Sequence, residues 1–274
     1  GGFGFVETYN VRLFTYLDGR QQARIYTKPI TTGKEKESEP PPEDESVDCP
    51  FLPPGQKATW YTEPKTRTQE DIEHSQRVSM NRTIQKIYEI ARSNRWEYFI
   101  TLTFDPQKHN SKNYDYITGI MHDWLKYLKK TYAPDLIYLI VPELHADGQK
   151  YHFHGVLANC GNIPFLESGH KIGNEPIYNI GAYKFGWSTA TKVKDTFRVS
   201  SYITKYITKD LCCVTMGKKR YWCSKNCNRP TVQNYHMTQE EISQILEDCQ
   251  ENIVFAKTAQ LPFIGQNIKY IEMV

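Results

Sequence analysis

Apolar and polar positions recur along this chain with two different spacings. Alternation of the two kinds predicts β-strands, and apolar positions three or four residues apart predict helices. The predicted elements are, in order, a hairpin over 5–30 around Asp18-Gly19, a helix over 69–93, a strand over 96–104, a helix over 114–132, strands over 136–143 and 151–158, an irregular stretch over 159–185, a short strand over 186–194, helices over 196–211 and 238–249, and an edge strand over 267–274.

The order of these elements predicts an α+β fold. Strand, helix, strand, strand, variable loop and helix in succession are typical of an antiparallel sheet with helices on one face. Residues 32–58 are rich in proline and acidic residues, and we expect them to form a flexible linker, because they have too little apolar surface to offset the entropy of ordering them. The chain then divides into an N-terminal β-hairpin over 1–31, an acidic proline-rich linker over 32–58, a helical lead-in over 59–95, a central domain over 96–211, and a basic and helical extension over 212–274 that packs on this domain.

Charge is distributed unevenly along the chain. The whole chain has a net charge of +3, but residues 34–48 contain seven acidic residues and two lysines. Residues 184–229 contain eleven lysines and arginines and two aspartates, a local net charge of +9. A basic region of this density is typical of proteins that bind a polyanion, and nucleic acid is the polyanion we expect.

The seven cysteines indicate reduced thiols in an intracellular protein, because their number is odd and no secretory signal precedes them. The four cysteines within 212–227 lack the paired CxxC spacing of a zinc ribbon. A structural zinc site is therefore the less favoured alternative for them. No run of about 18 apolar residues is present, so we expect no membrane contact.

A candidate metal site lies on the predicted hairpin around Asp147-Gly148. This dipeptide favours a tight turn, which would pair Glu143 with His152. Because side chains alternate along a strand, His154 lies on the same face, and the register groups Glu143, His152 and His154. Two imidazoles and a carboxylate suit Mg²⁺, Mn²⁺ or a similar divalent ion. The alternative is that both histidines are ordinary exposed strand residues; a third histidine, in the turn, could also replace one ligand.

A candidate nucleophile lies on the predicted helix over 196–211. The sequence SSYITKYITKD places Tyr202, Lys205, Tyr206 and Lys209 at positions that share one stripe of a helix. A phenol beside an ammonium can attack a phosphate, because the cation favours phenolate and balances charge in the transition state. The alternative is an amphipathic helix whose Tyr and Lys side chains only face solvent.

Candidate nucleic-acid contacts come from the basic region on both sides of this helix. The segment KKRYW combines cations for phosphates with an aromatic ring for a base. The alternative for this segment is a strand with solvated lysines. The candidate residues are Lys192, Lys194, Arg198, Lys218, Lys219, Arg220 and Trp222.

Three of these segments, in order, resemble the motifs of HUH endonucleases, the rolling-circle replication initiators of small phages and plasmids. FITLTFD (99–105) resembles their first motif, a central strand of the sheet. KYHFHGVL (150–157) resembles the histidine motif, with Glu143 at the place of the acidic third ligand. YITKYITK (202–209) resembles the two-tyrosine form of the third motif, found in initiators related to those of small single-stranded DNA phages.

The resemblance implies an RRM-like sheet with the metal hairpin in its middle strands and the tyrosine helix beside it. It implies that a divalent metal polarises a phosphate of single-stranded or hairpin origin DNA, and that one tyrosine attacks to leave a 5′-phosphotyrosine and a free 3′-OH. The second tyrosine, or the 3′-OH, then reverses the linkage. Since no GxxxxGK[ST] pattern is present, the implied partners include a separate host helicase and DNA polymerase in the bacterial cytoplasm.

Three alternatives remain open at this point. One is a non-catalytic nucleic-acid-binding protein with an RRM-like sheet, and another is a metal-dependent nuclease that activates water. The duplicated Tyr and Lys pattern disfavours both, because neither needs two phenols one helical turn apart. The third is a single-strand transposase or relaxase of the same superfamily.

Overall fold

The computed structural model describes residues 6–33, 47–48, 57–58, 68–261 and 265–274. The chain forms two compact units. One, the core unit, comprises residues 14–21 and 73–232; the other, the terminal unit, comprises residues 1–13, 22–72 and 233–274. All predicted site residues belong to the core unit.

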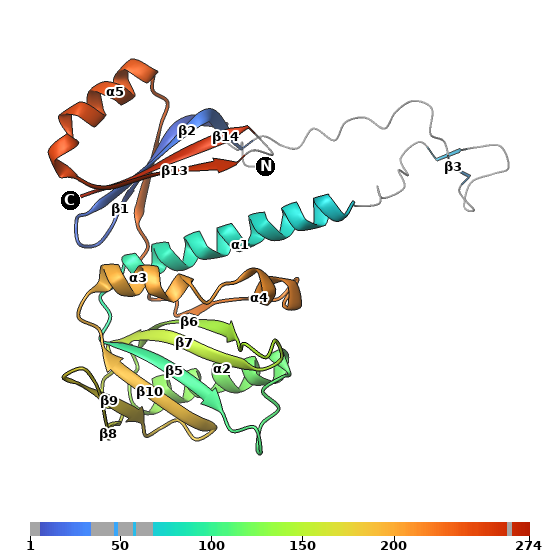
Figure 1. Ribbon diagram of the computed structural model, residues 1–274, viewed down its shortest axis with the longest axis vertical. Coiled ribbons are helices and arrows are strands. Elements are labelled where there is room, and N and C mark those ends of the chain that lie inside the picture. Colours follow the sequence, from blue (N-terminus) through green and yellow to red (C-terminus); the bar gives the residue numbers. More distant parts are fainter. Residues whose placement is uncertain (1–5, 34–46, 49–56, 59–67, 262–264) are drawn as a thin grey trace. The chain divides into compact units, whose positions relative to one another are not determined.

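The core unit is built on one seven-stranded antiparallel sheet (Figure 1). In space the strands follow the order β11-β6-β7-β5-β10-β9-β8, so that β7 lies between β6 and β5. This arrangement confirms the predicted α+β fold with a central antiparallel sheet. The strands are β5 (Tyr98–Phe104), β6 (Ile137–Leu144), β7 (Tyr151–Ala158), β8 (Phe165–Ile172), β9 (Glu175–Ile180), β10 (Gly186–Lys192) and β11 (Trp222–Cys223).

Helices cover both faces of this sheet, whereas the sequence analysis expected them on one face. The Tyr114 ring packs against Tyr151 of β7, but Tyr206 stacks on His154 of the same strand. Tyr151 and His154 are an odd number of residues apart, so their side chains leave opposite faces. The expectation was wrong because an apolar stripe predicts that a helix is buried and not which face buries it. The helices are α1 (Gln69–Arg92), α2 (Tyr114–Thr131), α3 (Thr196–Thr204) and α4 (Lys209–Val214).

Helix α2 forms as predicted because a capping residue precedes a regular apolar stripe. The Asn113 side chain accepts a hydrogen bond from Tyr116 N at the start of the helix. The stripe packs in one core with the buried side chains of β5 and β7, and each buried side chain contributes roughly 1.5–3 kcal/mol. Its members, each at most 2% exposed, are Ile117, Met121, Trp124, Leu125 and Leu128.

The terminal unit contributes most of a second sheet with the order β12-β1-β2-β14-β13. The predicted N-terminal hairpin is confirmed, with Gly19 in its turn at φ +83°. The predicted edge strand at the C-terminus is an interior strand, because β13, which the sequence analysis missed, pairs alongside it. The elements are β1 (Glu7–Thr15), β2 (Gln21–Thr32), β12 (Thr231–Tyr235), α5 (Gln239–Asp248), β13 (Ile253–Leu261) and β14 (Gln266–Met273).

Most of the predicted linker over 32–58 lies outside the described residues. Within it, β3 (Val47–Asp48) pairs with β4 (Lys57–Ala58). Across the described part of the chain, no helix is long and apolar enough to cross a membrane.

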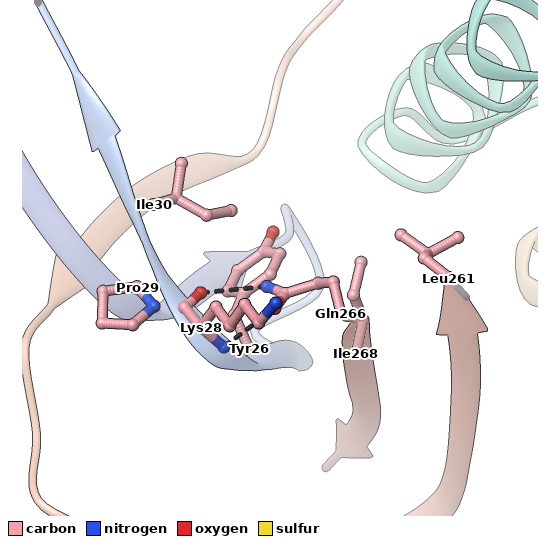
Figure 2. Close-up of a pocket in the computed structure, with 7 residues that line it drawn as sticks. All are labelled: Tyr26, Lys28, Pro29, Ile30, Leu261, Gln266 and Ile268. Atoms are coloured by element: carbon pink, nitrogen blue, oxygen red, sulfur yellow. Dashed lines mark hydrogen bonds between the residues drawn. The ribbon is translucent and has the colours of Figure 1, made fainter. Parts of the chain in front are cut away.

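A pocket of about 310 Å³ opens in the terminal unit (Figure 2). The Gln266 side chain holds both backbone groups of Lys28, with Nε2 donating to Lys28 O at 2.9 Å and Oε1 accepting from Lys28 N at 2.8 Å. None of the predicted site residues lines this pocket. Its lining consists of Tyr26, Lys28, Pro29, Ile30, Leu261, Gln266 and Ile268.

The stretch over 159–185, predicted to be irregular, contains the β8–β9 hairpin. Ile172 pairs with Glu175 across a turn at Gly173-Asn174, and Gly173 has φ +60°. Gly-Asn is a known hairpin signal. The register of the hairpin shifts between Glu167 and Lys171, and this irregularity breaks the alternation that would have revealed the strands.

Gly155 of β7 has no room for a side chain. A Cβ there would collide with Ile140 Cδ1 and lie 2.9 Å from Leu139 O. We expect Gly155→Ala to lower the free energy of unfolding by about 1–3 kcal/mol. Gly119→Ala is the matched control, because a Cβ at Gly119 of α2 meets nothing within 4 Å, and we expect it to be neutral or stabilising by up to about 1 kcal/mol. Urea denaturation measures both, and equal effects would contradict the close packing of β7.

Candidate active site

The β6–β7 hairpin has the predicted register. Glu143 pairs with His152, and His154 pairs with Val141. On its other side, His154 pairs with Thr101 of β5. Because directly paired residues share a face, Glu143, His152 and His154 leave the same face of the sheet, as predicted.

The turn of this hairpin differs from the predicted two-residue turn. His145 N donates to Lys150 O at 2.8 Å, so four residues connect the last bonded pair. The Asp147 side chain stabilises this longer loop by accepting hydrogen bonds from Gln149 N at 2.9 Å and Lys150 N at 3.0 Å. Both turns are centred between Asp147 and the following glycine, which explains why the register was correct although the turn was not.

His154 is fixed by hydrogen bonds at both ring nitrogens. Its Nε2 lies 2.6 Å from Glu143 Oε2, and its Nδ1 lies 3.1 Å from Thr101 Oγ1. The Thr101 hydroxyl can donate or accept, so it suits either tautomer of the imidazole. Two of the three predicted ligands therefore meet directly, and the hydrogen bond with Thr101 orients the His154 ring.

His152 lies on the same face, beside the hairpin turn. Its ring centroid is 5.2 Å from that of His145, the third histidine considered for the site. Burial lowers the pKa of both His152 and His154, which favours the neutral imidazole that a metal ion requires. Within the described ranges, no group of three or more His, Cys, Asp or Glu side chains is arranged to hold a metal ion.

The helix predicted over 196–211 is interrupted. Helix α3 ends at Thr204, and α4 begins only at Lys209. The Thr208 side chain accepts a hydrogen bond from Leu211 N and so caps a new helix, which competes with continuation of the first one. Tyr206 therefore lies in the connection, and Lys209 does not continue the stripe that Tyr202 and Lys205 begin.

Tyr202, Lys205 and Tyr206 nevertheless gather over the face of the sheet that carries His154. The Tyr206 ring stacks on His154 with centroids 3.7 Å apart and an interplanar angle of 5°. Tyr202 packs edge-on against both Tyr206 and Phe99 of β5. The Lys205 ammonium lies 3.6 Å from the centroid of the Tyr202 ring. The predicted neighbours thus meet, although on a helix end and not on a continuous stripe.

The two phenols have different environments. Tyr202 is 46% exposed, and hydrogen bonds from Lys205 and then Tyr206 lower the pKa of its phenol. Tyr206 is only 5% exposed, and burial followed by its hydrogen bond to Tyr202 raises its pKa. At neutral pH, Tyr202 is therefore the easier of the two to ionise.

The candidate nucleic-acid residues do not form one patch. Lys192, Lys194, Arg198, Lys218 and Lys219 are exposed. Lys194 pairs with Glu175 and Lys218 with Asp115, each at 2.6 Å. Lys192 pairs with Tyr98 in the β5–β10 register, which places its side chain on the face opposite to His154.

Two of these candidates, Arg220 and Trp222, make contacts within the protein. Arg220 is 8% exposed, and its guanidinium donates to Thr215 Oγ1 at 2.9 Å and Cys212 O at 3.0 Å. Trp222 packs edge-on against Phe153 in the core. The burial of Arg220 was not evident from the sequence around 218–222, because charge and aromaticity do not reveal burial, and contact of these residues with nucleic acid stays a prediction.

The cysteines of the 212–227 region do not come together as a four-residue cluster. Cys212 is buried and Cys213 exposed. Cys223 and Cys227 are neighbours, and their mutual hydrogen bond, with Arg229 nearby, lowers the pKa of Cys223 to about 6.

The sequence analysis missed Thr101 and Phe99 as site residues. Both lie on β5, within the segment that resembles the first motif, and both face His154 and the tyrosines. Alternation along β5 could have grouped them. Their partners remained hidden because the pairing of β5 with β7 joins residues far apart in the sequence.

The lowered pKa of Tyr202 can be measured directly. We expect a metal-free titration of phenolate absorbance, taken as the difference between wild type and Tyr202→Phe, to give a pKa below the usual value near 10. Lys205→Met should raise that pKa, because it removes the Lys205 hydrogen bond, which lowers the pKa of Tyr202 most. Lys209→Met is the control and should leave it unchanged. A pKa at or above the usual value in the wild type would contradict this description.

Comparison with known protein families adds one match. Residues 97–211 match the model of a family described as replication-associated protein ORF2/G2P. The segment covers less than half of the chain and contains Glu143, both histidines and both tyrosines. No curated protein and no solved structure matches the chain. The family match supports a rolling-circle replication initiator that acts on origin DNA.

Proposed function

We propose that this protein nicks single-stranded or hairpin origin DNA in a metal-dependent transesterification, and later rejoins the strands. The observation that carries the proposal is the environment of His154. Its Nε2 lies 2.6 Å from the Glu143 carboxylate, and its ring stacks on Tyr206. The predicted metal ligands and the predicted nucleophiles thus share one surface of the sheet.

The carboxylate oxygen and imidazole nitrogens of the predicted ligands are atom types that bind Mg²⁺ or Mn²⁺. Glu143 offers a carboxylate oxygen, His154 offers Nε2, and His152 lies across from Glu143 in the register. If a metal ion displaces the hydrogen bond between Nε2 and Glu143, the Thr101 hydroxyl can accept the Nδ1 proton of His154, which frees the Nε2 lone pair for the ion. A divalent ion held there would polarise the scissile phosphate and stabilise its developing charge.

Tyr202 is the proposed first nucleophile. Its exposure admits a DNA phosphate, and Lys205 favours the phenolate that attacks. The phenol oxygen bonds to phosphorus while the bond to the 3′-oxygen breaks, and the departing oxygen takes up a proton. A 5′-phosphotyrosine and a free 3′-OH result, with the energy of the phosphodiester bond kept in the new ester.

Tyr206 is assigned to the second transfer. Burial against His154 and a raised pKa make it the poorer nucleophile in the resting state. Tyr206 would attack a second scissile phosphate, which frees another 3′-OH. A 3′-OH that then attacks the Tyr202 phosphotyrosine would form the DNA phosphodiester, and the Tyr202 oxygen would leave and take up a proton. In the first step, the Tyr206 hydroxyl helps to lower the pKa of Tyr202 through their hydrogen bond.

The test is adduct formation on a randomised single-stranded DNA pool and on a pool with the native origin, each with Mn²⁺. Wild type should give a protein–DNA adduct that survives denaturing electrophoresis. Tyr202→Phe should reduce the initial adduct rate at least about 100-fold, because it removes the nucleophile. Tyr206→Phe should keep the first adduct and slow release. The double variant and His154→Ala should give none.

Each alternative function predicts a different result. Cleavage without adduct would assign a nuclease that activates water. Tight DNA binding with neither cleavage nor adduct, on both pools, would assign a non-catalytic binding protein. Adducts that rejoin only to a second DNA end, and never form circles, would favour a transposase or relaxase of the same superfamily.

The contact between Thr101 and His154 provides a second test. Thr101→Val keeps the shape of the side chain but removes the hydrogen bond to Nδ1. We expect it to weaken Mn²⁺ binding by about 10- to 100-fold, measured by calorimetry without DNA and by the Mn²⁺ dependence of nicking. Thr189→Val is the control, since Thr189 pairs with Thr101 on β10 and is exposed. Equal Mn²⁺ affinities in both variants would contradict the role of Thr101.

A further inference from the structure

Trp187 is an exposed tryptophan in a regular strand. Of the four tryptophans in the described part of the chain, Trp96 and Trp124 are buried, Trp222 is half-buried, and Trp187 is 61% exposed. An indole left in water forgoes a large hydrophobic stabilisation, so its position calls for an explanation.

The register of the sheet places Trp187 on the same face as the candidate active site. Trp187 of β10 pairs with Thr103 of β5, and Thr101 of β5 pairs with His154. Thr101 and Thr103 are two residues apart, so their side chains and those of their partners share one face. The indole therefore leaves the sheet on the side of His154 and Glu143.

Trp187 also lies close in the sheet order to two predicted ligands. Leu102 and Phe153 form the last pair of the β5–β7 register, and Thr103 and His152 are the next residues of these two strands. Glu143 pairs with His152. Because β5 lies between β7 and β10, two strand spacings, roughly 10 Å, separate the backbones of β7 and β10.

The neighbours of Trp187 leave its ring accessible while its backbone is fixed. The adjacent side chains on this face are Thr103 and Thr189, which are small, and Thr189 is exposed. Before it, Gly186 approaches β5 so closely that a Cβ would collide with Thr103 O. Strand β10 is therefore held tightly against β5 at the point where the indole projects.

We propose that Trp187 is a base-stacking site for single-stranded DNA, which holds a base of the strand whose phosphate lies at the candidate active site. The assignment rests on the proposed function, since it takes the substrate to be single-stranded DNA. A π-face suits every base, so the site contributes affinity and positioning with little sequence preference. Phosphate contacts alone would let the strand slide past the ligands, whereas a stacked base fixes its register.

The test compares a DNA with bases and one without. Binding of oligo-dT of about 20 nucleotides and of an abasic strand of equal length is measured by anisotropy in EDTA, where no cleavage can occur. We expect Trp187→Ala to weaken oligo-dT binding by roughly 5- to 100-fold and to leave the abasic strand unaffected. Trp187→Phe should retain most of the affinity. Oligo-dT should also quench tryptophan emission in the wild type more than in Trp187→Ala.

The control is Ile172→Ala, which truncates a side chain that is 64% exposed on the edge strand β8. It should change neither affinity, and thermal unfolding confirms that the variants are folded. Unchanged oligo-dT binding in Trp187→Ala, or an equal loss on both strands, would overturn the assignment. Base-dependent loss in a protein that forms no adduct would support stacking and reject nicking. Adducts together with base-independent binding would reject stacking alone.

Discussion

The pairing of β7 with β6 on one side and β5 on the other is the constraint on which the candidate site depends. It sets Glu143 opposite His152 and Thr101 opposite His154. A slip of one residue would carry both histidines into the core and expose Phe153, which is fully buried. Hydrophobic burial on one face of β7 therefore enforces the geometry of the polar groups on the other. No further interaction is needed to keep Glu143, His152 and His154 in this register.

The break between α3 and α4 creates a difference that a continuous helix would not. On a continuous stripe, Tyr202 and Tyr206 would have had similar surroundings. Because the helix ends at Thr204, Tyr206 turns in to stack on His154, while Tyr202 stays exposed beside Lys205. The same Thr208 cap that starts α4 thus separates one accessible, acidified phenol from one buried, weakly acidic phenol.

Local signals predicted much of the fold and the ligand set. The alternation of β6 and β7, together with Asp147-Gly148, predicted their register, and the apolar stripe of α2 predicted a buried helix. Non-local contacts could not be predicted in this way. The approach of β5 to β7, the burial of Arg220, the face that each helix covers and the exposure of Trp187 all depend on strand order. Strand order follows from the packing of the whole core, which no local pattern contains.

The face of the sheet that carries His154 and Trp187 has different side chains at its two ends, and these would contact a DNA strand in different ways. At one end, Tyr202 of α3 packs against Phe99 and Tyr206 stacks on His154, with Lys205 and the exposed Arg198 close along the chain. At the other end, Thr103 and Thr189 flank the indole of Trp187. Under the proposed function, cations and the attacking phenol act on the backbone at the covered end, and a stacked base fixes the strand at the open end. A strand bound in this way is held at two places, at the phosphate beside the predicted ligands and at the stacked base on β10. Holding a second point restricts movement of the phosphate that reacts, and positioning of this kind contributes strongly to phosphoryl transfer.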